Sequence, residues 1–162
     1  MRIEILHQRL LSLDAKPAHV RRILAAWLAA RPLDAGARRQ PAEHCLPQRL
    51  REALPELTET LAALASLRSE HAGADGSARL LVGLADGQTV ESVLLPRDGL
   101  CVSTQVGCAV GCAFCMTGQG GLLRQLGSAE IVAQLVLGRR LRAVKKVVFM
   151  GMGEPAHNLD NV

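Results

Sequence analysis

Three cysteines lie within eight residues of this chain, in the stretch CAVGCAFC at positions 108–115. Their spacing, Cys108-x3-Cys112-x2-Cys115, places three thiols on one short segment made otherwise of small and apolar residues. Only two other cysteines exist among the 162 residues, so the crowding favours a metal site in a reducing compartment over a disulfide framework. The chain must therefore form a tight loop here, and its neighbouring segments must hold that loop.

The number of thiols narrows the kind of metal site. Zinc prefers four ligands from paired cysteine and histidine clusters, and His71 and His157 are distant in sequence. Ferredoxin clusters use four cysteines with another spacing. A [4Fe–4S] cluster held by three thiolates would leave one iron open to a further ligand, and Gly107 and Gly111 would let the loop wrap closely around it. Three unconnected buried cysteines are the other interpretation.

The sequence around the array follows the order strand, loop, helix, strand. The short β-rich run 100–106 predicts a strand before the loop, and the apolar run 145–155 predicts a second strand that ends in glycines. Between them, 128–141 predicts a helix with Ser128 as N-cap and Glu130 in its first turn. Two strands joined through a helix form a βαβ unit with a right-handed crossover, so the fold class is predicted to be α/β with parallel strands.

The region before residue 68 has helical periodicity. Apolar residues recur at helical spacing in 3–13 and 17–28, and 47–67 offers one or two more helices, interrupted or started at Pro55. Residues 31–47 are rich in proline, glycine and alanine and are interpreted as a connection. Residues 1–68 are therefore expected to form a small helical unit.

A β-hairpin is predicted next, because two strand-like runs within 78–96 meet around Asp86-Gly87, a strong turn signal. In the second run, Val90 and every second residue after it point to one face of the strand. Glu91 and every second residue after it point to the other face. Glu91 thus shares a strand face with apolar residues. It is interpreted either as a charge at a sheet edge or as a group placed in a pocket.

Composition limits the function classes. The chain is 49% hydrophobic and 21% charged, which is ordinary for a folded protein. No apolar run approaches the ~20 residues that a membrane span requires, so a cytoplasmic protein is expected. Aromatic residues make up 2% of the chain, which argues against a platform on which several nucleic-acid bases stack.

Basic residues gather in two places. The net charge is +4, residues 1–40 hold eight Lys and Arg, and 139–146 (RRLRAVKK) holds five with no acid. For a charge run alone, a solvated helix face is favoured over RNA contact. If the first cluster binds RNA phosphates, the candidates are Arg21, Arg22, Arg38 and Arg39.

A second motif, GMGEP at 151–155, ends the second predicted strand. Parallel α/β folds place ligand sites at the carboxyl ends of their strands. Glycines there allow the backbone to approach a ligand closely, and backbone carbonyls could hold an ammonium group. Alone the motif would be a structural turn, but one βα unit after the cysteine loop it predicts a binding site.

The cysteine spacing together with GMGEP resembles the signature of radical S-adenosylmethionine (SAM) enzymes. More narrowly, VESVLLP, LCVSTQVGCAVGCAFC, SAEI and VVFMGMGEPAHNLDNV resemble the dual-specificity ribosomal and transfer RNA adenine-C2 methyltransferases. This likeness runs from about residue 75 to the chain end. The stretch DAKPAHVRRILAAWL is similar to the N-terminal helical domain of the same family.

The resemblance implies three parts. Residues 1–74 would be a helical RNA-contacting domain, 75–98 a β-hairpin connection, and 99–162 the start of a parallel (βα)6-type partial barrel, truncated after its second strand. The family needs further βα units and a methyl-carrying cysteine near its C-terminus. We therefore expect the chain to be an N-terminal fragment that is inactive alone.

The resemblance also assigns roles. The residues it implies as ligands of a [4Fe–4S] cluster are Cys108, Cys112 and Cys115. The open iron would bind SAM, which is cleaved to a 5′-deoxyadenosyl radical, and the protein would supply binding, orientation and exclusion of water. Gly153 and Glu154 would contact SAM. Glu91 matches a proton acceptor, and Cys101 matches a cysteine that assists resolution of an RNA-linked intermediate; without the likeness, Cys101 would be a small buried hydrophobe.

The expected activity is methylation of C2 of an adenosine in 23S ribosomal RNA, with transfer RNA as a further substrate and flavodoxin or ferredoxin as electron donor. Leu122 and Gln125 stand where the family has Phe and Asn, so a radical SAM enzyme acting on another substrate is one alternative. A catalytically inactive RNA-binding or cluster-carrying module is another. Such a module would not need Gly153 and Glu154.

Overall fold

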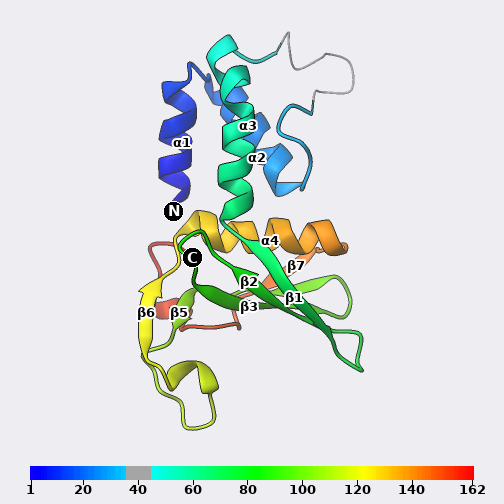
Figure 1. Ribbon diagram of the computed structural model, residues 1–162, viewed down its shortest axis with the longest axis vertical. Coiled ribbons are helices and arrows are strands. Elements are labelled where there is room, and N and C mark those ends of the chain that lie inside the picture. Colours follow the sequence, from blue (N-terminus) through cyan, green and yellow to red (C-terminus); the bar gives the residue numbers. More distant parts are fainter. Residues whose placement is uncertain (36–44) are drawn as a thin grey trace.

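The computed structural model describes residues 1–35 and 45–162. Its α-helices are α1 (Ile3–Ser12), α2 (Pro17–Leu28), α3 (Gln48–Ala63) and α4 (Ser128–Leu141). Helices α1 to α3 stand together at one end of the molecule, and α4 lies across their base, between them and a sheet (Figure 1). Within the described residues, no helix is long and apolar enough to cross a membrane.

The strands form two sheets. They are β1 (Ser66–Ala72), β2 (Ala78–Gly83), β3 (Thr89–Leu95), β4 (Gly99–Cys101), β5 (Gln105–Gly107), β6 (Leu122–Gln125) and β7 (Lys146–Val148). The larger sheet has the order β1-β2-β3-β4-β7, and β5 pairs with β6 in a separate two-stranded ribbon. Short 3-10 helices cover Met116–Gly118 and Pro155–His157. The predicted α/β class is confirmed.

The βαβ unit is present as β4, α4 and β7. Strands β4 and β7 are parallel neighbours, with Leu100 opposite Val147 and Cys101 opposite Val148. The other pairs in this sheet are antiparallel, so the sheet is mixed rather than parallel. Residues 1–35 and 45–162 thus contain one parallel pair, and the wider (βα)6-type barrel stays a prediction.

The β-hairpin is also confirmed. Strands β2 and β3 pair in register from Ala78 opposite Leu94 to Gly83 opposite Thr89. The connecting turn contains Gly87, which has a φ of 85°. This left-handed conformation is readily accessible to glycine, which is why Asp-Gly is a strong turn signal.

Strand β1 was not predicted, because the helical unit was expected to continue to residue 68. The structure ends α3 at Ala63 and pairs Ser66 of β1 with Gly83 of β2. Most side chains of β1 are exposed, so the strand lacks the apolar alternation that marks a half-buried strand. It forms because β2 supplies a row of hydrogen-bonding partners.

Two details of the helices differ from or settle the sequence-based expectations. Helix α3 is a single helix that continues through Pro55, so this residue neither interrupts nor starts it. The N-cap of α4 is Gly127 rather than Ser128. The Glu130 carboxylate accepts the Gly127 N–H at 2.8 Å, while the Ser128 hydroxyl accepts the N–H of Ile3 at 2.9 Å, so the serine is used to bind α1 instead.

One continuous hydrophobic core joins the helices to the sheet. It includes Leu10 of α1, Ile23 of α2 and Leu57 of α3, all fully enclosed. It continues through α4 to Leu80 and Leu100 of the sheet. The helical unit is therefore packed onto the βαβ unit, which fixes α4 from both sides.

Candidate cofactor-binding and catalytic site

The cysteine loop leaves the β5–β6 ribbon and returns to it. Its base is closed by a 3.0 Å hydrogen bond from the Cys108 N–H to the carbonyl of Gly121. Gly107 has a φ of 77°, and a Cβ atom at this position would strike the Gly121 carbonyl. Only glycine allows the two ends of the loop to meet so closely. Figure 1 shows the loop extending away from the helices, beyond the edge of the sheet.

The three cysteines of the loop differ in exposure. Cys108 is buried, Cys112 is exposed and Cys115 is half-buried. Across residues 1–35 and 45–162, no three Cys, His, Asp or Glu side chains are gathered closely enough to hold a metal ion. The structure therefore places the thiols on one loop without assembling them.

The chemistry of the donors nevertheless fits a metal cluster. A hydrogen bond from the Thr117 hydroxyl, followed by the N–H groups of Thr117 and Gly118, lowers the pKa of the Cys115 thiol. These donors stabilise the thiolate, which is the form that binds metals. The chemistry of three thiols on a loop closed at Gly107 thus fits a donor set for iron.

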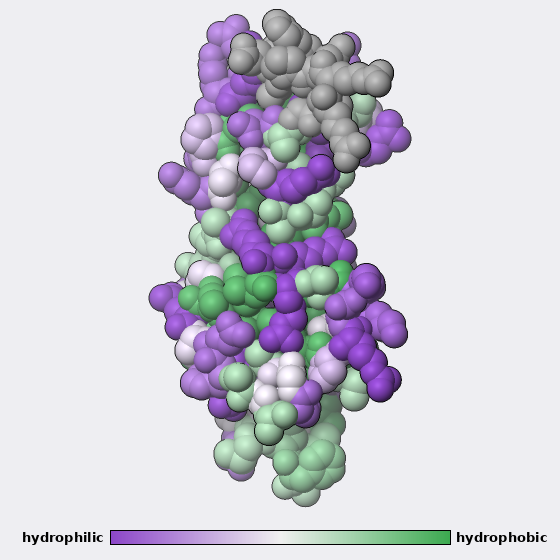
Figure 2. Space-filling view, turned by 90° about the vertical axis from the view of Figure 1, so that its right-hand side faces the viewer, coloured by the Kyte–Doolittle hydropathy of each residue, from purple (hydrophilic) through white to green (hydrophobic). Residues whose placement is uncertain are grey.

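Apolar side chains surround the cysteines on the loop surface. Phe114 is 93% exposed, Met116 75% and Leu123 66%. Figure 2 shows hydrophobic residues gathered at the end of the molecule where this loop lies. The loop thus presents thiols within an apolar surface.

The GMGEP motif continues beyond β7, alongside the segment that links β4 to β5. Its Met152 carbonyl accepts hydrogen bonds from the N–H groups of Thr104 and Gln105, at 2.9 and 3.3 Å. Gly153 has a φ of 95°, and a Cβ atom there would lie 2.5 Å from the Cβ of Gln105. The glycine is therefore required where the motif crosses the start of β5.

Glu154 is held from two directions. Its N–H donates to Oε1 of Gln105 at 2.8 Å, and its own carboxylate accepts the N–H of Ala156 at 3.0 Å. Gln105 in turn donates from Nε2 to Oε1 of Gln125 at 2.9 Å, and Gln125 donates to the carbonyl of His157 at 2.8 Å. Gln125, which stands where the resembled family has Asn, thus braces the GMGEP segment.

Ser103 joins three elements at the end of β4. Its hydroxyl donates to the carbonyl of Glu91 in β3 and accepts the N–H of Met152 at 2.8 Å. Its backbone N–H and carbonyl both bind the side-chain amide of Gln134 in α4, at 2.9 Å each. Ser103 and Gln134 are fully buried. Ser103 therefore fixes Glu91 relative to the GMGEP motif.

Glu91 lines a shallow hollow of about 280 Å³ together with Met116, Thr117 and Met152. These residues come from the hairpin, from the end of the cysteine loop and from GMGEP. The Glu91 carboxylate is half-exposed and lies 3.4 Å from the guanidinium of Arg79. It is thus both a pocket residue and a group that reaches solvent, which combines the two interpretations drawn from its strand position.

Cys101 ends β4 and lies inside the sheet. It is 6% exposed, and burial raises the pKa of its thiol. Its surroundings are those of a small buried hydrophobe, the interpretation that the sequence favours without the family resemblance. Cys101 is not one of the described residues that line the Glu91 hollow.

The basic residues fall into different environments. Arg21 is exposed on α2, whereas two guanidinium nitrogens of Arg22 are enclosed and have no hydrogen-bond partner. Arg38 and Arg39, the other two candidates for phosphate contacts, lie outside the described residues. Of the 139–146 cluster, three side chains bind within the protein: Arg139 to the carbonyl of Leu28, Arg142 to that of Gly76, and Lys145 to Asp98.

Three residues whose hydrogen bonds position the candidate site were not predicted from the sequence: Ser103, Gln105 and Gln134. All three are polar, and all are fully buried. The signal that could have identified Ser103 and Gln105 is their position in a polar stretch, 103–105, inside a predicted strand. Gln134 gives a similar signal on the inner face of α4.

Sequence comparisons give a consistent result. No family model matches the chain. A protein of Stutzerimonas stutzeri (strain A1501) is 70% identical over all 162 residues, and one of Azoarcus sp. (strain BH72) is 73% identical over the same span. Both carry the name "probable RNA methyltransferase". The chain covers 47% and 46% of these proteins, so it spans about half the length of the curated relatives it matches.

A solved structure agrees with these relatives. A radical SAM methyltransferase from Sphaerobacter thermophilus is 35% identical and superposes with a TM-score of 0.69. The match covers 99% of this chain and 48% of that one. The relationship predicted from the motifs is confirmed: this chain is related over its whole length to proteins named RNA methyltransferases, and it shares the fold of a radical SAM methyltransferase.

Proposed function

We propose that the protein carrying this chain is a radical SAM methyltransferase that methylates C2 of an adenosine in 23S ribosomal RNA, with transfer RNA as a further substrate. One observation carries the proposal. The Glu91 hollow brings together the hairpin, the residues that follow Cys115, and Met152 of GMGEP. Three motifs far apart in sequence meet at one place, as they must in a site where a cofactor and a substrate react.

The residues that would hold a [4Fe–4S] cluster are Cys108, Cys112 and Cys115. When bound, the cluster would supply the reductive cleavage of SAM. The chain's own part would be to hold the cluster and to orient SAM. Gly153 and Glu154 would contact SAM, and the Gln105 side chain fixes the Glu154 N–H that helps to shape this contact.

Glu91 would accept the proton that leaves the adenine carbon after the new bond forms. A base must be ionised and must reach the reacting atom. Its half-exposed carboxylate can be reached by an RNA base, and it lies 3.4 Å from the guanidinium of Arg79. Cys101, enclosed in β4, would need to become accessible for the role that the resemblance implies.

The remaining partners follow from the same proposal. Flavodoxin or ferredoxin would deliver the electron, and the reaction would take place in the cytoplasm. The 162 residues alone would be inactive, since the relatives are about twice as long. A radical SAM enzyme with another substrate is the second candidate, and the observation that favours it is the use of Gln125 beside the GMGEP motif.

The proposal is tested in the complete protein in two steps. Anaerobic reconstitution should give about four irons and four sulfides per chain. Cys112→Ala should lose them, whereas the matched control Cys101→Ala should keep them because Cys101 is buried in the sheet. Mass spectrometry of nucleosides from ribosomal and transfer RNA, with and without the gene, should then show C2-methyladenosine only with it. Tightly bound zinc without sulfide, or unchanged nucleosides, would refute it.

A further inference from the structure

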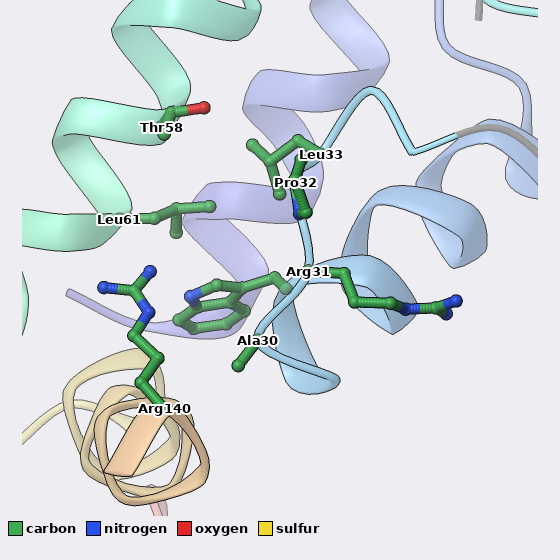
Figure 3. A pocket seen from close by; sticks show the side chains of 8 residues that line it. Ala30, Arg31, Pro32, Leu33, Thr58, Leu61 and Arg140 are labelled. Carbon is green, nitrogen blue, oxygen red and sulfur yellow. The ribbon is translucent and has the colours of Figure 1, made fainter. Parts of the chain in front are cut away.

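A second hollow lies between the N-terminal helices and α4 (Figure 3). Its volume is about 300 Å³, at the lower end of the ~300–1,000 Å³ typical of small-ligand sites. The walls come from α2, α3, the segment that follows α2, and Arg140 of α4. No residue of this hollow belongs to the Glu91 site.

The hollow is apolar except at a few points. Leu33 and Leu61 form buried walls, and Trp27 is only 3% exposed. The indole N–H of Trp27 donates to no acceptor in residues 1–35 and 45–162. The indole nitrogen is not one of the fully enclosed side-chain atoms that lack a partner, so it remains accessible from the cavity. A donor without a protein acceptor, accessible from the cavity that its otherwise buried side chain lines, points to a ligand with an acceptor edge.

Arg140 adds a positive charge. In Figure 3 its side chain rises from α4 toward Leu61, whereas the guanidinium of Arg31 points away from it. Arg139 and Arg142 bind backbone carbonyls, but Arg140 has no hydrogen bond or ion pair with any residue that the structure describes. The described lining contains no Asp or Glu. The described lining of the cavity therefore contains a cationic side chain that no acidic side chain neutralises.

A ligand that satisfies this cavity has a flat apolar body, an acceptor on its edge and an adjoining negative charge. A nucleotide has all three. We propose that the cavity receives one base of a single-stranded RNA segment, with the Trp27 N–H donating to the base edge and Arg140 binding a neighbouring phosphate. The choice of RNA rests on the proposed function, and RNA is commonly read through unstacked bases in single strands.

The shape of the surface suits one base at a time. The chain has too few aromatic residues for a stacking platform, so a concave pocket is the available way to bury a base. A neighbouring hollow of about 330 Å³ shares Pro32, Leu33 and Thr58 with the first and continues along α3 to Arg51, with Asp34 also on its wall. This continuation provides room for the backbone that leads to the bound base.

The test uses the complete protein and a fluorescein-labelled single-stranded RNA decamer of mixed sequence, with binding followed by fluorescence anisotropy. Thr58→Phe fills the cavity. Thr58 is exposed and its hydroxyl binds only the carbonyl of Leu54 in its own helix, so the change removes little packing. Arg140→Gln removes the cation, and Arg142→Gln is its matched control two residues away.

Filling the cavity should weaken RNA binding about tenfold, the loss expected for one buried base, and leave the salt dependence unchanged. Arg140→Gln should lower the slope of log K against log salt by about 0.7. Arg142→Gln should leave affinity within about twofold of wild type. Trp27→Phe, which keeps an apolar ring but loses the N–H, should cost roughly fivefold. Circular dichroism confirms that each variant is folded.

Equal affinity of Thr58→Phe and wild type, or equal salt slopes of the two arginine variants, would overturn the proposal. Free AMP that bound at micromolar concentration, while Thr58→Phe left RNA binding unchanged, would assign the cavity to a small nucleotide and overturn it too. Nucleoside mass spectrometry keeps the two proposals apart. Persisting C2 methylation with unchanged binding refutes only the cavity, whereas absence of methylation in the wild type refutes the proposed function.

Discussion

Ser103 and Gln134 pair as two peptide groups pair in a sheet. The N–H of Ser103 donates to Oε1 of Gln134, and Nε2 of Gln134 donates to the carbonyl of Ser103, both at 2.9 Å. Strand β4 has already ended at Cys101, so this buried peptide has no neighbouring strand on that side. The side-chain amide of Gln134 in α4 takes the place of that missing strand. It thereby fixes the residue whose hydroxyl joins Glu91 to Met152.

Replacing Gln134 should therefore be costly. Gln134→Leu leaves the N–H and carbonyl of Ser103 buried and unpaired, and we expect the free energy of unfolding to fall by about 2–5 kcal/mol. Ser92→Ala is the control, because Ser92 donates a single hydrogen bond to the same amide and its loss should cost about 1 kcal/mol. Urea denaturation followed by circular dichroism measures both. Equal losses in the two variants would contradict the pairing argument.

Gly153 should not tolerate a side chain. In Gly153→Ala the new Cβ would meet the Cβ of Gln105 at 2.5 Å, and the φ of 95° is unfavourable for alanine. The backbone must shift and loosen the bond between the Glu154 N–H and Gln105. We expect the affinity for SAM to fall at least tenfold in the reconstituted complete protein, as measured by equilibrium dialysis.

The matched control for Gly153→Ala is Gly120→Ala, on the cysteine loop. A Cβ atom at Gly120 meets nothing within 4 Å, and its φ is not in the left-handed region. SAM affinity should remain within about twofold of wild type in this variant. A Gly153→Ala protein that bound SAM as tightly as Gly120→Ala would remove the motif from the cofactor site.

Glu91→Gln should separate the chemical steps. The amide keeps the shape of the side chain but is not a base, so methyl transfer to RNA should fall by 10²-fold or more. Cluster content and reductive cleavage of SAM should persist. Arg79→Gln is the companion change, and its effect on methylation should remain within about tenfold because the Arg79–Glu91 pair is half-exposed. Unchanged methylation in Glu91→Gln would exclude it as the proton acceptor.

Glu130 should make stability depend on pH. Burial alone would raise the pKa of this carboxyl, but hydrogen bonds from Arg124 and from the Gly127 N–H, together with the Met1 ammonium, lower it below its ordinary 4.5. The ionised form therefore stabilises the folded state above about pH 4.5. This contribution is lost as the pH falls through the lower folded-state pKa.

Acid titration of folding tests this sign. Glu130→Gln should be less stable than wild type at pH 7 by at least about 1 kcal/mol, and the difference should shrink below pH 4.5. Glu56→Gln serves as the control, because Glu56 forms an exposed pair with Arg9 and should change stability by no more than about 1 kcal/mol. A constant difference between wild type and Glu130→Gln from pH 7 to pH 3 would refute the argument.

Much of the fold could be predicted from local signals. The hairpin at Asp86-Gly87 and helices α1 and α2 follow from turn chemistry and apolar periodicity, which act between residues close in sequence. Strand β1 could not be predicted, because its exposed side chains have no period and its order comes from β2. The N-cap of α4 was misassigned because Ser128 binds Ile3, a residue distant in sequence.

The sequence by itself determined which residues have the chemistry: three thiols at a fixed spacing, a glycine-rich motif one βα unit later, and a carboxylate on a strand. These motifs are defined by residue type and by spacing along the chain, so they can be identified without the folded structure. Only the tertiary structure decided that Glu91, Thr117 and Met152 share one hollow and that Ser103 and Gln134 hold it in place. Those contacts depend on how β3, β4 and α4 pack. Packing arises from the burial of apolar surface, which is non-directional, so apolar periodicity shows which face of an element is buried but not which other element covers it.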